Sequence, residues 1–186
     1  MPPDAARRSD RSRRAILAAA LELVEALGYS RLTIEAVAGH ARVGKQTIYR
    51  WWPSKGPLLF EAFVELGPAQ RDPVHTGDLV VDLKAELRAA VEELGERRFD
   101  QVCRALLHES RTDLVTLMLT PRRVGVEGLL QVARRSGGLR PDVDVAVAAE
   151  LLLGPVYQRW LLRTAPLTAG YADAVVDLVL PALRSR

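Results

Sequence analysis

Apolar residues recur at steps of three and four along most of this chain of 186 residues. Such spacing is typical of helices with one buried face, and no segment shows the clear alternation of a half-buried strand. We therefore predict an all-α fold. The expected helices cover about residues 9–27, 33–41, 45–52, 54–66, 79–94, 99–109, 114–119, 121–135, 143–162 and 172–183.

Glycines and prolines set the expected breaks between these helices. Residues 67–77, which include two prolines and two glycines, form the main candidate linker. Pro121 is expected to break or begin a helix, because proline lacks the N–H that a helix interior needs. For the same reason Gly154 and Pro155 are expected to interrupt or bend the helix over residues 143–162.

The most informative segment is a pair of short helices joined by a tight turn. Thr33 is a suitable N-cap for the first helix, and Glu35 in its first turn suits the positive end of the helix dipole. Arg42, Val43 and Gly44 form a turn of the length that joins two crossed helices, with Val43 expected to plug the core beneath it. The pattern therefore predicts a helix-turn-helix.

The second helix of this pair, over residues 45–52, has distinct inner and outer edges. At roughly 100° per residue, Ile48 and Trp52 face inward with the turn, whereas Gln46 and Arg50 point nearly opposite. Hydroxyl and phenol groups on the flanks complete an outer edge that can reach base edges or phosphate oxygens. DNA binding is therefore the leading hypothesis.

Charge favours the same hypothesis. Lys55, after the helix-ending Pro53, lies in the first turn of the next helix, where a cation opposes the helix dipole but suits a nearby phosphate. Residues 1–56 carry ten Lys and Arg against five Asp and Glu, whereas the remaining 130 residues carry 16 against 18. A basic N-terminal arm, which could reach DNA or form a disordered solubilising tail, contains Arg7, Arg8, Arg11, Arg13 and Arg14.

The segment from Thr33 to Lys55, TIEAVAGHARVGKQTIYRWWPSK, resembles the helix-turn-helix of the tetracycline-repressor (TetR) family of bacterial regulators. The resemblance covers about the first third of the chain. It departs from the family at Arg42, where glycine is usual, and at the aromatic pair Trp51 and Trp52. It implies a DNA-binding domain of three helices at residues 1–56, with the helix-turn-helix at about 33–52, and a helical ligand-binding and dimerisation domain at residues 57–186.

The resemblance also implies roles for individual side chains. Family positions that touch bases or nearby phosphates match Lys45, Gln46, Thr47 and Tyr49, and positions that contact the DNA backbone match Thr33, Trp51 and Lys55. The outer edge adds Arg50, and the turn adds Arg42, which either contacts a phosphate or is solvated. The alternatives are that Tyr49 packs at the helix edge and that Lys45 and Arg50 are ordinary solvated charges.

The last two expected helices, residues 143–162 and 172–183, are apolar on more than one face and must be covered on several sides. We therefore expect a homodimer in which these helices pair with their copies as a four-helix bundle, as the resemblance also implies. Two recognition helices about one DNA turn apart would read a palindrome. The family also implies an inducer pocket, whose candidate lining is Phe99, Cys103, Leu107, Met118, Tyr157 and Trp160, with a filled core as the alternative.

Other function classes find little support. The single cysteine, Cys103, rules out an intramolecular disulfide and favours a reducing compartment, and no signal peptide or membrane span is evident, so a cytoplasmic protein is expected. Cys103 and His108 lie about 140° apart on one helix, and no metal-ligand spacing or phosphate loop occurs, so we expect no enzyme, metal or cofactor.

We therefore predict a sequence-specific transcriptional regulator, a repressor released from a palindromic operator by a small-molecule inducer. The alternative is a helical ligand-binding or protein-interaction module that keeps a structural helix-turn-helix. The outer edge of residues 45–52 favours the regulator, because a structural unit would not require those polar groups.

Overall fold

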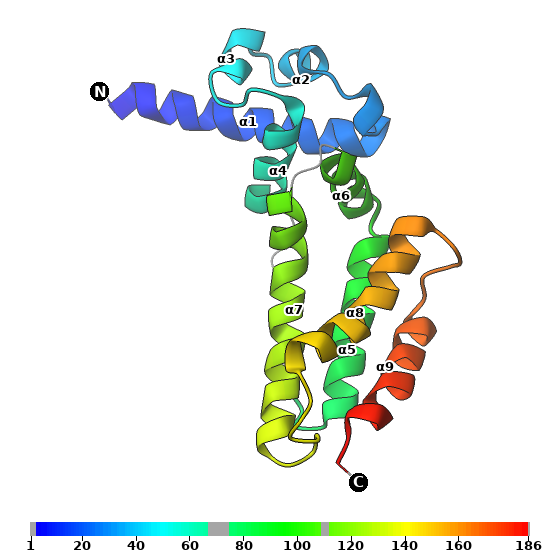
Figure 1. Cartoon of the computed structure of the whole chain (residues 1–186). Helices are drawn as coiled ribbons and strands as arrows, with labels where there is room; N and C mark the ends of the chain where they lie inside the picture. The colour runs from blue at the N-terminus through cyan, green and yellow to red at the C-terminus, as the bar shows by residue number, and fades with distance from the viewer. Residues whose placement is uncertain (1–2, 67–74, 109–111, 186) are drawn as a thin grey trace. The chain divides into compact units, whose positions relative to one another are not determined.

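The computed structural model describes residues 3–66, 75–108 and 112–185, and the all-α prediction is confirmed for these residues. Figure 1 labels the helices. They are α1 (Pro3–Leu27), the 3-10 turn η1 (Tyr29–Arg31), α2 (Ile34–His40), α3 (Lys45–Tyr49), α4 (Lys55–Leu66), α5 (Leu79–Gly95), α6 (Arg97–His108), α7 (Thr112–Arg135), α8 (Val145–Leu162) and α9 (Ala169–Leu183). Most of the predicted linker, residues 67–74, lies outside the described residues.

The chain forms two compact units. Unit 1 comprises residues 1–70 and 97–114, and unit 2 comprises residues 71–96 and 115–186. Unit 1 therefore contains α1–α4 and α6, whereas unit 2 contains α5, α8, α9 and most of α7.

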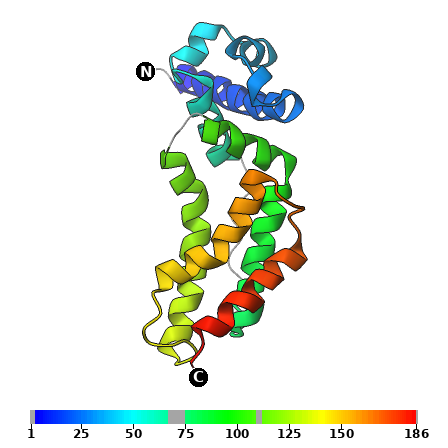
Figure 2. The same ribbon diagram turned by 45° about the vertical axis from the view of Figure 1, so that its right-hand side comes forward.

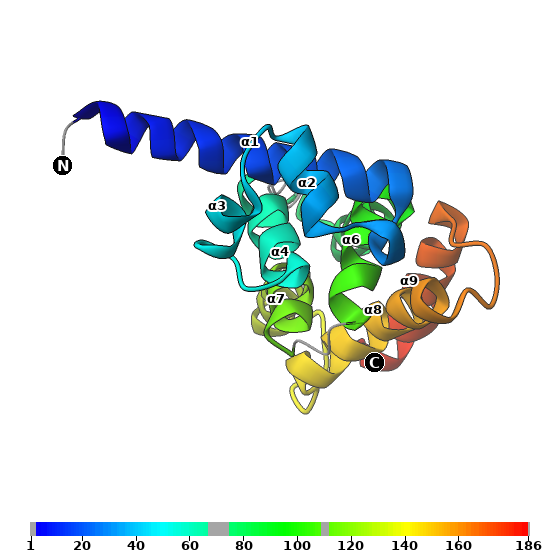
Figure 3. The ribbon, with the colours of Figure 1, turned by 90° about the horizontal axis from the view of Figure 1, so that it is seen from above.

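Helix α1 is the centre of unit 1 and contacts α2, α4 and α6. Its buried face contains Ile16, Leu17, Ala20 and Val24, the spacing of a single helical stripe. The helix begins at Pro3, six residues before the expected start, and its first turns extend beyond α2, α3 and α4 (Figure 3). Proline is favoured at the first helical position, which explains the longer helix.

The predicted basic arm is therefore part of this helix. Arg13 forms ion pairs with Glu61 and Glu65 of α4, so this arginine joins two helices of unit 1. Arg11 and Arg14 are exposed. The side chains of Arg7 and Arg8 lie outside the described residues.

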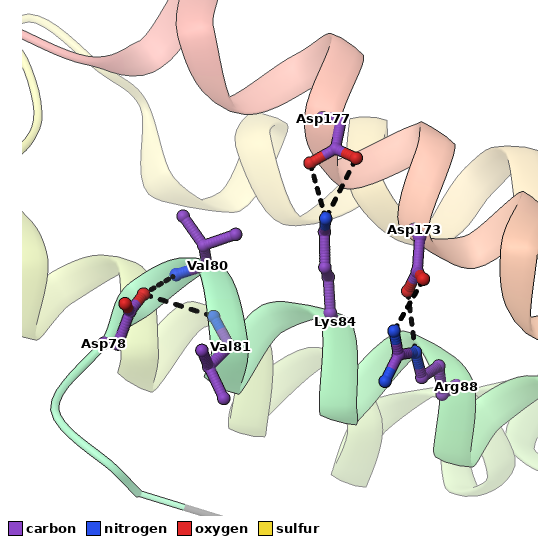
Figure 4. Close-up of polar contacts among 7 residues, drawn as sticks. All are labelled: Asp78, Val80, Val81, Lys84, Arg88, Asp173 and Asp177. Carbon is purple, nitrogen blue, oxygen red and sulfur yellow. Dashed lines mark hydrogen bonds and ion pairs between the residues drawn. The ribbon is translucent and has the colours of Figure 1, made fainter.

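In unit 2, α5 lies beside α8 and α9, and these two helices also contact each other (Figure 2). Two ion pairs join α5 to α9 on the surface (Figure 4). Lys84 Nζ lies 2.7 Å from a carboxylate oxygen of Asp177, and the Arg88 guanidinium donates to both carboxylate oxygens of Asp173 at 2.7 and 2.6 Å. These hydrogen bonds lower the pKa of Asp173.

A second charged cluster joins α5 to α7. Arg122 donates to Glu86 at 3.1 Å and to Glu93 at 2.9 Å. Glu86 is one of two buried charged residues among the described core residues, and the other, Asp82, accepts hydrogen bonds from Thr76. These contacts satisfy carboxylates that burial would otherwise penalise.

The structure corrects the expected effect of two prolines. Pro121 was expected to break or begin a helix and Pro155 to interrupt or bend one. Both lie inside continuous helices, α7 and α8, so the expected breaks are wrong, whereas a bend of α8 at Pro155 stays a prediction. Proline removes the donor to the carbonyl four residues earlier. In α8 that carbonyl belongs to Leu151, which is exposed in the single chain.

Candidate DNA-binding site

The helix-turn-helix of unit 1 begins at Thr33. This residue is the N-cap of α2, as predicted, and its hydroxyl oxygen accepts from the Ala36 N–H at 3.1 Å. The hydroxyl can still donate its own proton, because a Ser or Thr hydroxyl both accepts and donates. Thr33 is exposed, so that donor remains available to a phosphate.

The turn between α2 and α3 places Arg42 in an unusual conformation. Its φ is 56°, in the left-handed region that favours glycine. This explains why glycine is usual there in the sequences that this segment resembles. Val43 closes the turn by donating its N–H to the Ala38 carbonyl at 2.9 Å, but its side chain is only half-buried, so its predicted role as a core plug is wrong in part.

Helix α3 has the inner and outer edges that the spacing predicts. Ile48 is fully buried and Trp52 nearly so, whereas Gln46, Tyr49 and Arg50 are exposed. The helix ends at Tyr49, three residues earlier than expected. Pro53 disfavours helical geometry at the preceding residue, and the chain leaves the helix through a turn.

Trp52 is held by a carboxylate that the sequence analysis missed. Its indole N–H donates to Glu61 of α4 at 2.8 Å, and the same carboxylate pairs with Arg13 of α1. Glu61 thus joins the C-terminal side of α3 to α4 and α1. The N–H of a buried tryptophan usually needs a hydrogen-bond acceptor. Trp52 therefore indicated that an acceptor exists, but the sequence did not identify it as Glu61.

Lys55 has a structural position that the sequence analysis also missed. Its ammonium donates to the carbonyls of Tyr29 at 2.9 Å and Leu32 at 3.1 Å, and it lies 4.0 Å from the centre of the Tyr29 ring. An ammonium has three N–H donors, so one remains for a further acceptor such as a phosphate. The hydrogen bonds to the two carbonyls account for a lysine at this position without DNA. The predicted contact of Lys55 with the DNA backbone stays a prediction.

Lys45, the first residue of α3, pairs with a carboxylate of α2. Its Nζ donates to Glu35 at 3.0 Å, and both side chains are exposed. The hydrogen bond from this ammonium lowers the pKa of Glu35. From the sequence, Glu35 was expected only to interact favourably with the dipole of α2.

The nine predicted DNA-binding residues lie in one segment of unit 1, from the start of α2 to the start of α4. Seven are exposed: Thr33, Arg42, Lys45, Gln46, Tyr49, Arg50 and Trp51. Thr47 and Lys55 are half-buried. The guanidinium of Arg50 lies 5.8 Å from the centre of the exposed Trp51 ring, so cation and aromatic surface are presented together.

The six predicted pocket residues fall in both units. Phe99, Cys103 and Leu107 lie on α6, where Phe99 and Cys103 are buried and Phe99 packs edge-on against Phe63 at 5.2 Å. Tyr157 and Trp160 lie on α8 in unit 2. The side chains of Met118 and His108 lie outside the described residues. A shared pocket stays a prediction.

The described residues contain no helix long and apolar enough to cross a membrane. Nor do they contain a group of three or more His, Cys, Asp or Glu side chains arranged to hold a metal ion.

The conformation of Arg42 predicts a change in stability. Replacing Arg42 with Gly should raise the free energy of unfolding by about 1 kcal/mol, because the left-handed backbone costs a non-glycine residue about 1–2 kcal/mol, and the greater freedom of glycine in the unfolded chain offsets part of that. Urea denaturation measures the change. Arg42→Ala is the matched control, since it removes the same charge but retains the strain. Equal stability of the two variants would contradict the prediction.

A short helix anchored by one edge, exposing polar groups on the other and joined by a turn to a capped helix, defines a helix-turn-helix DNA-binding domain. Comparison with known proteins agrees. Residues 16–62 match the family model described as bacterial regulatory proteins of the tetR family, and residues 73–179 match the tetracyclin repressor-like C-terminal domain. The chain belongs to the TetR family of helix-turn-helix transcriptional regulators.

Individual relatives cover nearly the whole chain. An uncharacterised helix-turn-helix regulator of Mycobacterium tuberculosis, Rv1556, is 33% identical over 90% of this chain and 86% of its own length. The DNA-binding transcriptional repressor TetR of Mycobacteroides abscessus is 30% identical over 89% of this chain and 90% of its own length. The crystal structure of the TetR family regulator SCO0332 is 34% identical, with a TM-score of 0.66, and covers 94% of this chain and 99% of that one.

Proposed function

We propose that this protein is a homodimeric repressor that binds a palindromic operator through α3 and is released when a small molecule binds its C-terminal domain. The observation that carries the proposal is the outer edge of α3. Gln46, Tyr49 and Arg50 are exposed there, while the inner edge is anchored by Ile48 and Trp52. Amide, phenol and guanidinium groups can read base edges or bind phosphates.

In this proposal residues 1–56 bind DNA, and residues 57–186 bind the effector and form the dimer. The effector pocket would be lined by the six residues predicted from the sequence. Release requires two conformations with different affinities for effector and DNA, and we place the change in α4, which follows the helix-turn-helix directly. A regulator of the bacterial chromosome works in the cytoplasm.

Exposed apolar residues on α8 and α9 support the homodimer. Leu151, Leu161 and Leu162 of α8 and Leu178 of α9 are all exposed in a single chain. Helices α8 and α9 contact each other, and several large apolar side chains left exposed on such a pair favour an interaction surface. A second copy of α8 and α9 would cover them as a four-helix bundle.

The test is binding of the purified protein to the DNA upstream of its own gene, compared with scrambled DNA of equal length at two salt concentrations. We expect tight binding to a palindrome with a steep salt dependence. Weak and equal binding to both DNAs, followed by failure to select any preferred sequence from random DNA, would overturn the proposal and favour the alternative of an interaction module.

Tyr49 provides a sharper test of α3. Tyr49→Phe should weaken operator binding about fivefold for each half-site without changing dimerisation or stability, because one hydroxyl hydrogen bond contributes about 1 kcal/mol. Titration of a fluorescent operator measures the affinity. Lys55→Ala is a poorer probe, since it also removes the bonds to the Tyr29 and Leu32 carbonyls. Unchanged affinity of Tyr49→Phe would show that the phenol packs at the helix edge instead.

A further inference from the structure

The first cation of the recognition helix is already neutralised in the free protein. Lys45 opens α3, and its ammonium lies 3.0 Å from a carboxylate oxygen of Glu35 in the first turn of α2. The two residues are ten apart in sequence, so the pair forms only because the turn brings the two helices together. The same surface is the one proposed to meet DNA.

The pair adds little to the fold. Both side chains are more than half exposed, and exposed ion pairs contribute little to stability because water screens them. Helix α2 is already capped by Thr33, and its inner face is held by buried Ile34 and Val37. The clearer consequence of the pair is electrostatic, since it removes one free positive charge from the surface of α3.

We propose, on the basis of the DNA-binding role of α3, that Glu35 competes with DNA for Lys45. A phosphate that approaches Lys45 must either displace the Glu35 carboxylate or lie close to this second negative charge. Both reduce the favourable free energy of the contact between Lys45 and the phosphate. Binding to nonspecific DNA is mainly electrostatic, so this carboxylate limits the affinity for any sequence. Glu35 would thus set how strongly the protein is retained on DNA outside its operator.

Removing the charge of Glu35 should therefore strengthen DNA binding. Glu35→Gln keeps the size of the side chain but not its charge. For each subunit that contacts the DNA, we expect roughly fivefold tighter binding to both operator and scrambled DNA, which corresponds to the upper end for an exposed ion pair. The slope of the logarithm of affinity against the logarithm of salt should steepen by about one for each such subunit, because one more lysine charge per subunit neutralises a phosphate.

Glu22→Gln is a matched control in the same unit. Glu22 is 59% exposed against 58% for Glu35, and it pairs with His40 at 2.8 Å instead of with a residue of α3. This control measures the general effect of removing one negative charge, which we expect to stay below about twofold because separated surface charges are screened. A second control combines Glu35→Gln with Lys45→Gln. Relative to Lys45→Gln alone, the added Glu35→Gln should then increase the DNA affinity no more than Glu22→Gln does.

The experiment uses the full-length protein, with titrations of fluorescent operator and scrambled DNA at three or more salt concentrations. The proposal is overturned if Glu35→Gln gains no more than Glu22→Gln, if it weakens binding, or if its gain survives in the Lys45→Gln background. Weakened binding would mean that Glu35 positions Lys45 for DNA. Because the effect is measured on scrambled DNA as well, it can be tested even if the protein has no preference for the operator.

Discussion

Replacing Arg122 with Met should lower the free energy of unfolding by roughly 2–4 kcal/mol, because it leaves the buried Glu86 carboxylate without its cation, while partial exposure of Arg122 and Glu93 lessens the cost. Arg122 lies on α7 and forms ion pairs with two residues of α5, Glu86 and Glu93. The Glu86 side chain is only 9% exposed. Burial lowers the pKa of Arg122, but its hydrogen bonds to the two carboxylates more than compensate and raise it. Urea denaturation at a fixed protein concentration measures the loss.

Two further variants separate the buried charge from other causes. Arg140→Met changes another arginine of unit 2, whose ion pair with Asp142 is more exposed, and should cost no more than about 1 kcal/mol. Adding Glu86→Leu to Arg122→Met should restore much of the stability, since replacing both partners of a buried pair by apolar residues is often nearly neutral. A double variant no more stable than Arg122→Met would show that packing, and not the unpaired Glu86, causes the loss.

Leu178→Asp should convert the proposed dimer into a monomer of 20.5 kDa. Leu178 is 79% exposed on α9, and a twofold interface would bury it in both subunits. Losing the burial of two leucines costs about 3–6 kcal/mol, which raises the dissociation constant by roughly two to four orders of magnitude. Sedimentation equilibrium at micromolar concentration measures the change.

The control for this variant is Val132→Asp. Val132 is an exposed apolar residue of α7, also in unit 2, and the same charge there should leave the dimer intact. Operator affinity should fall with Leu178→Asp, because a monomer binds only one half-site. A wild-type monomer would refute the dimer, whereas a dimer that survives Leu178→Asp would place the interface away from this part of α9.

The helix-turn-helix was predictable from sequence because its information is local. A capping threonine, a turn of three residues and an inner stripe of Ile48 and Trp52 lie within about twenty residues, where helical periodicity decides what is buried. The predicted N-cap and the two edges of α3 are confirmed. The end of α3 at Tyr49 was not predicted, and Pro53 does not account for it alone, since proline restricts only the preceding residue, Trp52.

The remaining features depend on partners that local patterns do not reveal. Glu61, Glu35 and the carbonyls around Lys55 become partners only when separate helices and turns pack together. The continuous helices through Pro121 and Pro155 have a similar cause, since packing of the flanking turns can outweigh one lost hydrogen bond. Convergence of the pocket residues is a tertiary property, and the DNA contacts themselves stay predictions.

The paired charges between α5 and α9 bear on how two subunits could assemble. Lys84 meets Asp177 and Arg88 meets Asp173, so the two helices run antiparallel with both contacts one turn apart (Figure 4). Sliding α9 by one turn would leave one cation and one carboxylate without a partner, so a single alignment is favoured. A helix held in this way presents the same surface in every molecule, including Leu178. Two subunits would then meet with α9 already in one alignment along α5, so no change in that alignment would be needed before they pair.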